Sequence, residues 1–384
     1  MSVVAIIAEY NPFHNGHEYQ INSIRKMFSD CPNSMVIAVM SGSLVQRGEF
    51  ALISKYHRAK AALLCGADAV FELPSVYSCA PANLFASSAV SIINALGGVD
   101  YLCFGSESGD IDRLKFAADN ADNIVLDGSS RNASYPRVFH DAFAGLYGEE
   151  RAQVFKGSND ILAVEYLRAI IKHGSTIEPI AIKRGGQDGD DYITSASRIR
   201  AAVHSGTYDT LRDFMPEQSA NLLSELIITG KTADINNISS AVISHIKRLD
   251  ASQIAQFAEI IGGIEHRIKK SRALTHSDLV NDLRSKHCTI SQVNRMVLNV
   301  FFEITREQQQ SPPPFTVLLG ANEKGRLYLN KIRKSAKIKI ITKPADSAHI
   351  PELMKNLFID DVYKLALGDN SGEVSAVLEK PVIL

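Results

Sequence analysis

The stretch VVAIIAEYNPFHNGH, residues 3–17, joins a six-residue apolar run to a loop that contains two histidines. An apolar run without alternation is typical of a strand that is buried on both faces of a sheet. Pro12 cannot continue a helix or a central strand, so it predicts a turn, and Gly16 allows the backbone to pass close to a ligand. Helical spacing begins at Glu18. The chain therefore opens with a predicted strand, loop and helix.

The two histidines of this loop, His14 and His17, flank the first turn of the predicted helix. The free N–H groups and positive dipole end of such a turn form an anion site, and two imidazoles add donors for phosphate oxygens. In a reaction at the α-phosphate of a nucleotide, these donors would stabilise the developing charge. Two other interpretations stay open: the histidines belong to a zinc site, which needs at least a third ligand, or they only cap the helix.

Strands and helices alternate over the first 200 residues. Apolar runs predict further strands at 35–40, 69–73, 101–104 and 177–182. Helical spacing predicts helices at 18–28, 56–65, 81–96, 111–118 and 160–173. This alternation predicts an α/β fold with a Rossmann-like parallel sheet that is covered on both faces. Ligands of such sheets bind outside the carboxyl ends of the strands.

The pattern changes after Gly206, where helical spacing dominates. Helices are predicted at 224–228, 239–249, 254–261, 277–284 and 290–302, and a linker rich in Gln and Pro at 308–314. Strands at 315–319 and 338–341, a basic helix at 324–334 and a last helix at 350–367 follow. We therefore expect a catalytic nucleotide-binding domain at 1–205, a helical region at 206–310 and a small α/β region at 311–384.

Composition restricts the class of protein. The 384 residues are 45% hydrophobic and carry a net charge of -1, which excludes a disordered chain and a uniformly basic nucleic-acid binder. Division after Arg200 separates 18 basic and 22 acidic residues from 23 basic and 20 acidic residues. Five cysteines without paired spacing predict a reducing, cytoplasmic location, no segment is apolar enough to predict a membrane span, and no protein partner is implied.

Several blocks of sequence follow one another in an order that resembles the bacterial tRNA(Met) cytidine acetate ligases, a family of the HxGH nucleotidyltransferase superfamily. The matching blocks are residues 9–17, 40–42, 46–49, 66–68, 72–74, 104–107, 134–136, 158–162, 182–184 and 195–200, with a weaker match at 320–326. The tetrapeptide His14 to His17 alone is moderately specific, whereas the ordered series is highly specific.

The resemblance implies an ATP-dependent enzyme that makes acetyl-adenylate from acetate. It then acetylates N4 of the wobble cytidine in elongator tRNA(Met), which yields N4-acetylcytidine. The implied cofactors are ATP, as a substrate, and Mg²⁺, with no metal-binding side chain assigned. Two alternatives are a small-molecule nucleotidyltransferase of the same fold and a non-catalytic protein that binds nucleotide and RNA.

The resemblance also implies roles for individual residues. His14 and His17 would be catalytic. The ATP site would comprise Ile7, Ala8, Glu9, Tyr10, Asn11, Pro12, Phe13, His14, Asn15, Gly16, His17, Glu18, Tyr19, Gln20, Gly105, Asn159, Arg184, Ser197 and Arg200. Gly105 and Asn159 have structural alternatives, a turn at the end of a strand and a helix N-cap.

Polar and basic residues outside the ATP site are candidates for the other substrates. Gln46, Arg47, Lys55 and Arg58 would face acetate or the incoming tRNA, although a plain polar loop would look the same. Basic clusters in the second half suit RNA phosphates, or are solvated helix faces. The tRNA candidates are Arg267, Lys269, Lys270, Lys324, Arg326, Lys331, Arg333 and Lys334.

Overall fold

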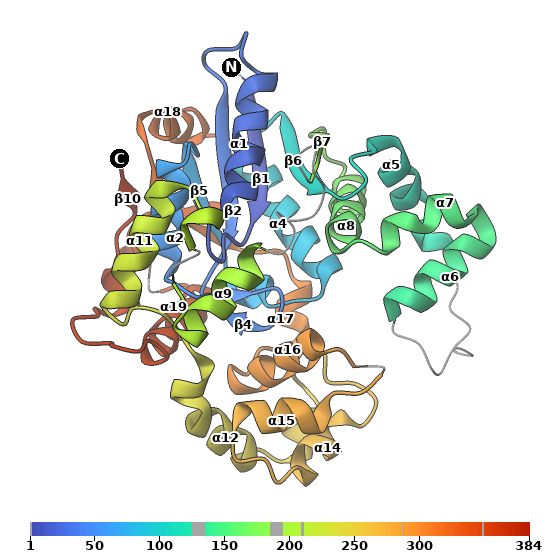
Figure 1. The fold of residues 1–384 in the computed structure, drawn as a ribbon, viewed down its shortest axis with the longest axis vertical. Coiled ribbons are helices and arrows are strands. Elements are labelled where there is room, and N and C mark those ends of the chain that lie inside the picture. Colours follow the sequence, from blue (N-terminus) through green and yellow to red (C-terminus); the bar gives the residue numbers. More distant parts are fainter. Residues whose placement is uncertain (1, 125–134, 185–194, 209–210, 287, 348) are drawn as a thin grey trace.

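The computed structural model describes residues 2–124, 135–184, 195–208, 211–286, 288–347 and 349–384. Its main sheet has the strand order β10-β8-β5-β2-β1-β6-β7, and β9 pairs with β8 (Figure 1). The strands are β1 Val3–Ala8, β2 Met35–Ser41, β5 Ala69–Leu73, β6 Tyr101–Ser106, β7 Glu178–Lys183, β8 Phe315–Ala321, β9 Lys339–Ile341 and β10 Val382–Ile383. Ser134 and the loop after Arg184 lie outside the described residues.

The expected parallel sheet is confirmed. Strands β5, β2, β1, β6 and β7 run parallel, and every residue of β1, β2 and β5 is buried. The chain leaves β1 toward β2 and β5 and then returns to β6 on the other side. The strand order therefore reverses between β1 and β6, which is where ligands of such folds bind.

Helices cover both faces of this sheet. Alternate residues of β1 enter two hydrophobic cores: Val3, Ala5 and Ile7 face α4 and α8, and Val4 and Ile6 face α1, α2 and α11. The helices before Gly206 are α1 Asn15–Met27, α2 Lys55–Leu64, α3 Ser75–Ser78, α4 Ala82–Leu96, α5 Ile111–Asn120, α6 Tyr135–Tyr147, α7 Glu149–Ala152, α8 Ser158–Lys172 and α9 Ser195–Ser205.

Helices α12, α14, α15 and α16 of the helical region lie below the carboxyl edge of the sheet in the view of Figure 1, whereas α11 lies beside α2. The helices of this region are α10 Leu211–Phe214, α11 Glu217–Ile228, α12 Ser239–Arg248, α13 Ala251–Ile254, α14 Ile264–Lys270, α15 His276–Leu283, α16 Ile290–Phe301 and α17 Arg306–Gln310. The expected helix at 254–261 is wrong. Helix α13 ends at Ile254, Phe257 pairs with Thr305, and Glu259 has a left-handed φ of 59°.

The expected linker at 308–314 is partly wrong. Gln308 belongs to α17, where it forms a capping box with Thr305. Gln309 is buried, and its amide donates to the carbonyl oxygens of Val76 (3.1 Å) and Cys79 (2.8 Å). Glutamine in a loop-like stretch thus serves as a helix cap and as a buried donor.

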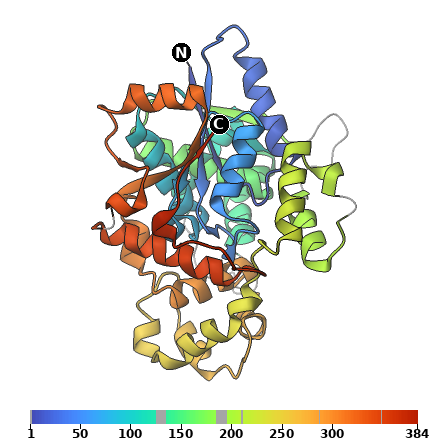
Figure 2. The same cartoon turned by 90° about the vertical axis from the view of Figure 1, so that its left-hand side faces the viewer.

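The last region joins the main sheet directly. Strand β8 pairs antiparallel with β5, and β10 pairs parallel with β8. Its helices are α18 Glu323–Ile332 and α19 Pro351–Leu365 (Figure 2). The division into three regions stays a prediction, and strand pairing links the third region to the first.

Candidate nucleotide-binding site

Backbone N–H groups at the start of α1 hold the rings of the two histidines. The Gly16 N–H donates to Nδ1 of His14 (3.0 Å), and the His14 N–H donates to Nδ1 of His17 (3.2 Å). The rings stack with centroids 3.8 Å apart. Since both Nδ1 atoms accept, each neutral ring carries its proton on Nε2. Helix capping therefore uses one nitrogen of each ring and leaves the Nε2–H donors without a partner among the described residues.

Burial and neighbouring arginines keep both rings neutral. Burial, with Arg184 and Arg200 nearby, lowers the pKa of His14 to about 3. Burial and the adjacent His14 and Arg184 hold the pKa of His17 well below its ordinary value. Two neutral donors near two guanidinium groups suit phosphate oxygens.

Protein stability is expected to fall below pH 6.5 because of these histidines. An unfolded histidine has a pKa of about 6.5, so the unfolded chain takes up a proton that folded His14 refuses. Lowering the pH from 7.5 to 5.5 should therefore cost about 1.4 kcal/mol of unfolding free energy for each such histidine. Urea unfolding at both pH values should show a smaller loss for His14→Asn than for the unmodified protein; equal losses would contradict the assignment.

Asn159, Arg184 and Gly105 lie close together on the β6 side of the point where the strand order reverses, and the histidines lie on the β1 side. Nη1 of the Arg184 guanidinium group donates to Oδ1 of Asn159 (3.2 Å). The Arg184 side chain lies across Gly105, where an added Cβ would be 3.0 Å from its Cγ. Gly105 therefore allows this close approach, since a larger residue would displace the Arg184 side chain, and its φ is not in the left-handed region.

Asn159 is not the N-cap of α8, because Gly157 has that position. Its amide donates to Oε1 of Glu107 (2.7 Å), whose carboxylate also accepts the backbone N–H groups of Asn159 and Asp160 (3.0 and 2.6 Å). Glu107 thus occupies the start of α8 and orients Asn159 toward Arg184.

A cavity of about 410 Å³ opens at the carboxyl edge of the sheet beside His17, Asn159 and Arg184, and His14 lies just behind His17 without lining it. Residues from β1, α1, β6 and α8 share its wall with residues from α4, α16 and the hairpin of β3 Leu44–Val45 and β4 Glu49–Phe50. The lining residues are Ile7, Ala8, Glu9, His17, Gln20, Gln46, Arg47, Ala82, Phe85, Phe104, Gly105, Ser158, Asn159, Ile161, Leu162, Tyr166, Arg184, Ser291 and Arg295. We call it the histidine cavity.

A second cavity, of about 510 Å³, adjoins the first and shares Gln20, Gly105 and Arg184 with it. It is lined along α1 and β7 by Asn15, Gly16, Glu18, Tyr19, Gln20, Asn22, Gly105, Ile182, Lys183 and Arg184. Together the two cavities take in most of the residues that the sequence predicts for ATP.

Three of the loop residues that the sequence predicts for the ATP site are buried and support the loop. Tyr10, Asn11 and Phe13 are buried, and the ring of Tyr10 packs against Phe13 and His17 at centroid distances of 4.9 and 4.8 Å. Oδ1 of Asn11 accepts the Leu52 N–H (2.7 Å). These side chains hold the loop in place, and Pro12 follows Asn11 through a cis peptide bond.

Ser197 and Arg200 lie on α9, which does not line the histidine cavity. Ser197 is exposed. Nη1 of Arg200 donates to the Asn11 carbonyl oxygen (2.9 Å), and Nε lies 3.8 Å from Glu49. Arg200 is close enough to lower the pKa of His14, so its charge reaches the histidines although its side chain rests on the loop.

The expectation that Lys55 and Arg58 face a substrate is corrected by their burial. Nζ of Lys55 contacts Glu72 (2.8 Å) and Asp360 (2.5 Å), and all three side chains are at most 3% exposed. Arg58 is fully buried and donates to four backbone carbonyl oxygens. These cations join α2 to β5, α19 and the carboxyl ends of β1 and β2, and none of their hydrogen bonds leads into the cavity.

Gln46 and Arg47 do reach the cavity, from the hairpin of β3 Leu44–Val45 and β4 Glu49–Phe50. The hairpin tip rests on α16: an added Cβ on Gly48, which has a φ of 76°, would lie 2.3 Å from the Arg295 backbone nitrogen. Arg295 donates to the Gln46 carbonyl oxygen (3.2 Å) and is paired with Glu259 at 2.6 Å. The hairpin position therefore depends on a helix 250 residues later in the chain.

The tRNA candidates fall into two groups at opposite ends of the molecule (Figure 1). Arg267 and Lys269 on α14 donate to the last carbonyl oxygens of α15 and α12, and Lys270 is exposed. Lys324, Arg326, Lys331, Arg333 and Lys334 are exposed on or just after α18. Helix α18 begins beside Asp68, at the amino edge of the sheet, so it lies away from the histidines.

Several residues of the histidine cavity were not predicted. Phe104 is the last residue of a predicted strand, and ligands bind at the carboxyl ends of such strands, so its place in the cavity could have been predicted. Phe85, Tyr166, Ser291 and Arg295 lie on helices far apart in the chain, and no local pattern marks them. Among the described residues, no group of three or more His, Cys, Asp or Glu side chains is placed to hold a metal ion. No helix in the same ranges is long and apolar enough to cross a membrane.

A doubly wound sheet with paired histidines at the start of its first helix defines an α/β nucleotide-binding protein of the HxGH class. A family model described as HIGH Nucleotidyl Transferase matches residues 1–375. The tRNA(Met) cytidine acetate ligases of Acetivibrio thermocellus and Lysinibacillus sphaericus are 33% and 34% identical; the alignments cover 90% and 96% of this chain and 89% and 95% of the relatives. The chain belongs to the HIGH nucleotidyl transferases and, within them, to the tRNA(Met) cytidine acetate ligase family.

A solved structure agrees with this membership. The crystal structure of Thermotoga maritima TmcAL bound with alpha-thio ATP has a TM-score of 0.89 with this chain at 29% identity, and the alignment covers all of both chains. The fold class expected from the sequence is thus confirmed for the whole chain, in a family of ligases.

Proposed function

We propose that this protein uses ATP to activate acetate as acetyl-adenylate and transfers the acetyl group to N4 of the wobble cytidine of elongator tRNA(Met). N4-acetylcytidine, AMP and pyrophosphate would be the products. A tRNA substrate would locate the reaction in the cytoplasm. The proposal rests on the family membership and on the chemistry of the residues around the histidine cavity.

The observation that carries the proposal is the pair of neutral histidines with free Nε2–H donors. ATP phosphates would lie against these donors and against Arg184, while the nucleoside would enter the adjoining cavity along α1. Attack of acetate on the α-phosphate adds negative charge to the phosphorus centre and releases pyrophosphate. Fixed donors that need no reorganisation stabilise that charge without a covalent intermediate on the protein.

The histidine cavity has room for more than acetate. An acetate ion fills a small part of about 410 Å³, and the aromatic side chains Phe85, Phe104 and Tyr166 line the remainder. Aromatic walls suit a flat base from a single-stranded RNA loop. We therefore assign the acetyl-phosphate end of acetyl-adenylate and the acceptor cytosine to the histidine cavity, with the adenosine part of the adenylate in the adjoining cavity. Mg²⁺ stays a prediction, and it would arrive with the ATP phosphates, since magnesium binds mainly through phosphate and water oxygens.

The test is pyrophosphate exchange into ATP with the purified protein. Exchange should require acetate, and a second assay with elongator tRNA(Met) should form N4-acetylcytidine, detected by mass spectrometry of the digested RNA. Exchange that proceeds without acetate, or that prefers another acid, would contradict the substrate assignment and favour a small-molecule nucleotidyltransferase. ATP binding without exchange or product would favour a non-catalytic binding protein.

A further inference from the structure

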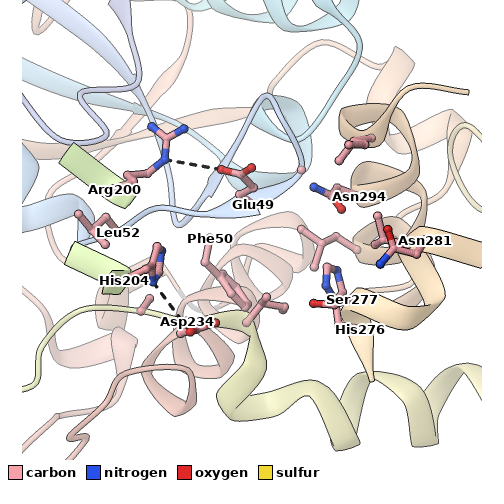
Figure 3. A pocket seen from close by; sticks show the side chains of 16 residues that line it. Glu49, Phe50, Leu52, Arg200, His204, Asp234, His276, Ser277, Asn281 and Asn294 are labelled. Atoms are coloured by element: carbon pink, nitrogen blue, oxygen red, sulfur yellow. Dashed lines mark ion pairs between the residues drawn. The ribbon is translucent and has the colours of Figure 1, made fainter. Parts of the chain in front are cut away.

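A third cavity, of about 440 Å³, lies on the other side of the hairpin tip, between the catalytic domain and the helical region (Figure 3). Phe50 and Leu52 form its wall on the catalytic side, and Val280 and Leu298 form it on the side of α15 and α16. A volume of this size accepts a ring-containing ligand rather than a single small ion. We call it the junction cavity.

The two carboxylates of the junction cavity lie beside an arginine and a histidine. Nε of Arg200 lies 3.8 Å from Oε2 of Glu49, and Nδ1 of His204 lies 3.9 Å from Oδ2 of Asp234. Figure 3 shows both pairs on the same side of the cavity. An anion such as acetate or phosphate would therefore meet the carboxylate of Glu49 beside Arg200 and that of Asp234 beside His204. The lining favours a neutral ligand.

The opposite side of the cavity carries neutral polar groups that lack partners. His276 is 7% exposed, and its Nε2 is buried without a hydrogen-bond partner. Asn294 is 8% exposed, and its side-chain amide makes no hydrogen bond among the described residues. An unpaired buried polar group costs free energy, which a ligand with a matching edge would recover. Ser277 and Asn281 add a hydroxyl and an amide at the rim.

The junction cavity and the histidine cavity are separated only by the hairpin tip and α16. Gln46 and Arg47 face the histidine cavity, whereas Gly48 and Glu49 face the junction cavity. On α16, Arg295 lines the first and Asn294 the second. A single-stranded segment could thus place one base on each side of the tip. Flat apolar walls with a few neutral donors and acceptors are the usual environment of an unstacked base.

We propose that the junction cavity binds a second nucleobase of the RNA substrate, a neighbour of the acceptor cytidine, through the amides of Asn294 and Asn281 and the imidazole of His276. This inference rests on the proposed function. It adds a site for an unmodified base that positions the acceptor. Recognition at this site contributes to the choice of RNA and takes no part in the activation of acetate.

The experiment measures binding of anticodon stem-loop RNAs of elongator tRNA(Met) by fluorescence anisotropy. Each RNA lacks one base of the loop, and each is tested with the unmodified protein and with Asn294→Ala and Asn281→Ala. Removal of one particular base other than the acceptor should weaken binding to the unmodified protein roughly 10-fold. The same removal should change binding to Asn294→Ala less than 2-fold, because the contact between that base and the amide is already absent in the variant. Acetate-dependent pyrophosphate exchange should be unchanged in both variants.

Asn33→Ala is the matched control, since Asn33 is exposed at the amino edge of the sheet. It should retain the full pattern of base dependence. Asn281 is exposed on α15, so its variant carries little risk of misfolding if Asn294→Ala is unstable. The inference would be overturned if every base removal weakened binding equally in the variants and in the unmodified protein. It would also be overturned if none of the stem-loops bound. Because binding needs no turnover, absence of acetylcytidine would contradict the proposed function alone.

Discussion

Replacing His17 with alanine is expected to lower acetate-dependent pyrophosphate exchange about 10²-fold to 10³-fold, which is the usual effect of removing one charge-stabilising donor. Nδ1 of His17 accepts the His14 N–H, so Nε2–H is the donor that remains for the α-phosphate. The same loss should appear in acetyl transfer to tRNA, since adenylate would form that much more slowly. Radioactive pyrophosphate exchange measures the first step directly.

The variant His14→Asn separates capping from catalysis. Asparagine is among the best N-cap residues, so it should retain the bond from the Gly16 N–H and the stability of α1, while it removes the Nε2 donor. Exchange should fall although the unfolding midpoint at pH 7.5 stays close to that of the unmodified protein. Full activity of His14→Asn would mean that the histidine only caps the helix. His173→Ala is a control, because that histidine contacts Ser87 on α4, away from the loop.

Replacing Lys55 with methionine is expected to lower the free energy of unfolding by about 3–5 kcal/mol, because the change leaves Glu72 and Asp360 buried without their shared cation. Burial alone would lower the pKa of Lys55, but Asp360 and Glu72 hold it well above the ordinary value, so the lysine is charged in the folded protein. Asp360 also accepts from the Ser43 hydroxyl (2.6 Å), and Asn356 donates to Glu72 (3.0 Å). Loss of the lysine therefore disturbs α2, β5 and α19 together. Urea unfolding measures the change.

Lys60→Met is the matched control, since Lys60 is exposed on the same helix. Its unfolding free energy should change by less than about 0.5 kcal/mol, as is usual for surface substitutions. If Lys55→Met retained its stability and instead needed more acetate, Lys55 would contact substrate as the sequence indicates. A stable variant with normal exchange would contradict both interpretations.

The difference between Arg47 and Arg58 shows what sequence patterns resolve. Both stand in one polar run that follows the second strand, and both were expected to face a substrate. Arg47 is exposed at the cavity, whereas Arg58 is fully buried and bonded to carbonyl oxygens of its own domain. Nothing in a polar run distinguishes these outcomes, because the carbonyl groups that Arg58 satisfies belong to segments 5 to 49 residues away.

The chemistry of neighbouring residues was sufficient to predict the first strand, the histidine loop and the start of α1. The strand is buried on both faces because its residues are all apolar, and the histidines meet because they lie three positions apart at a helix start. These relations need only neighbouring residues, so the sequence alone determined the fold class and the position of the histidine loop.

The tertiary structure decided the rest of the site. It placed α16 against the hairpin, gave Lys55 a partner 305 residues away and put α18 at the edge of the sheet opposite the histidines. The physical reason is that burial and ion pairing depend on which surfaces meet, and sequence periodicity records only that a surface is apolar. Long-range packing therefore determined which charged side chains reach the cavities and which stabilise the core.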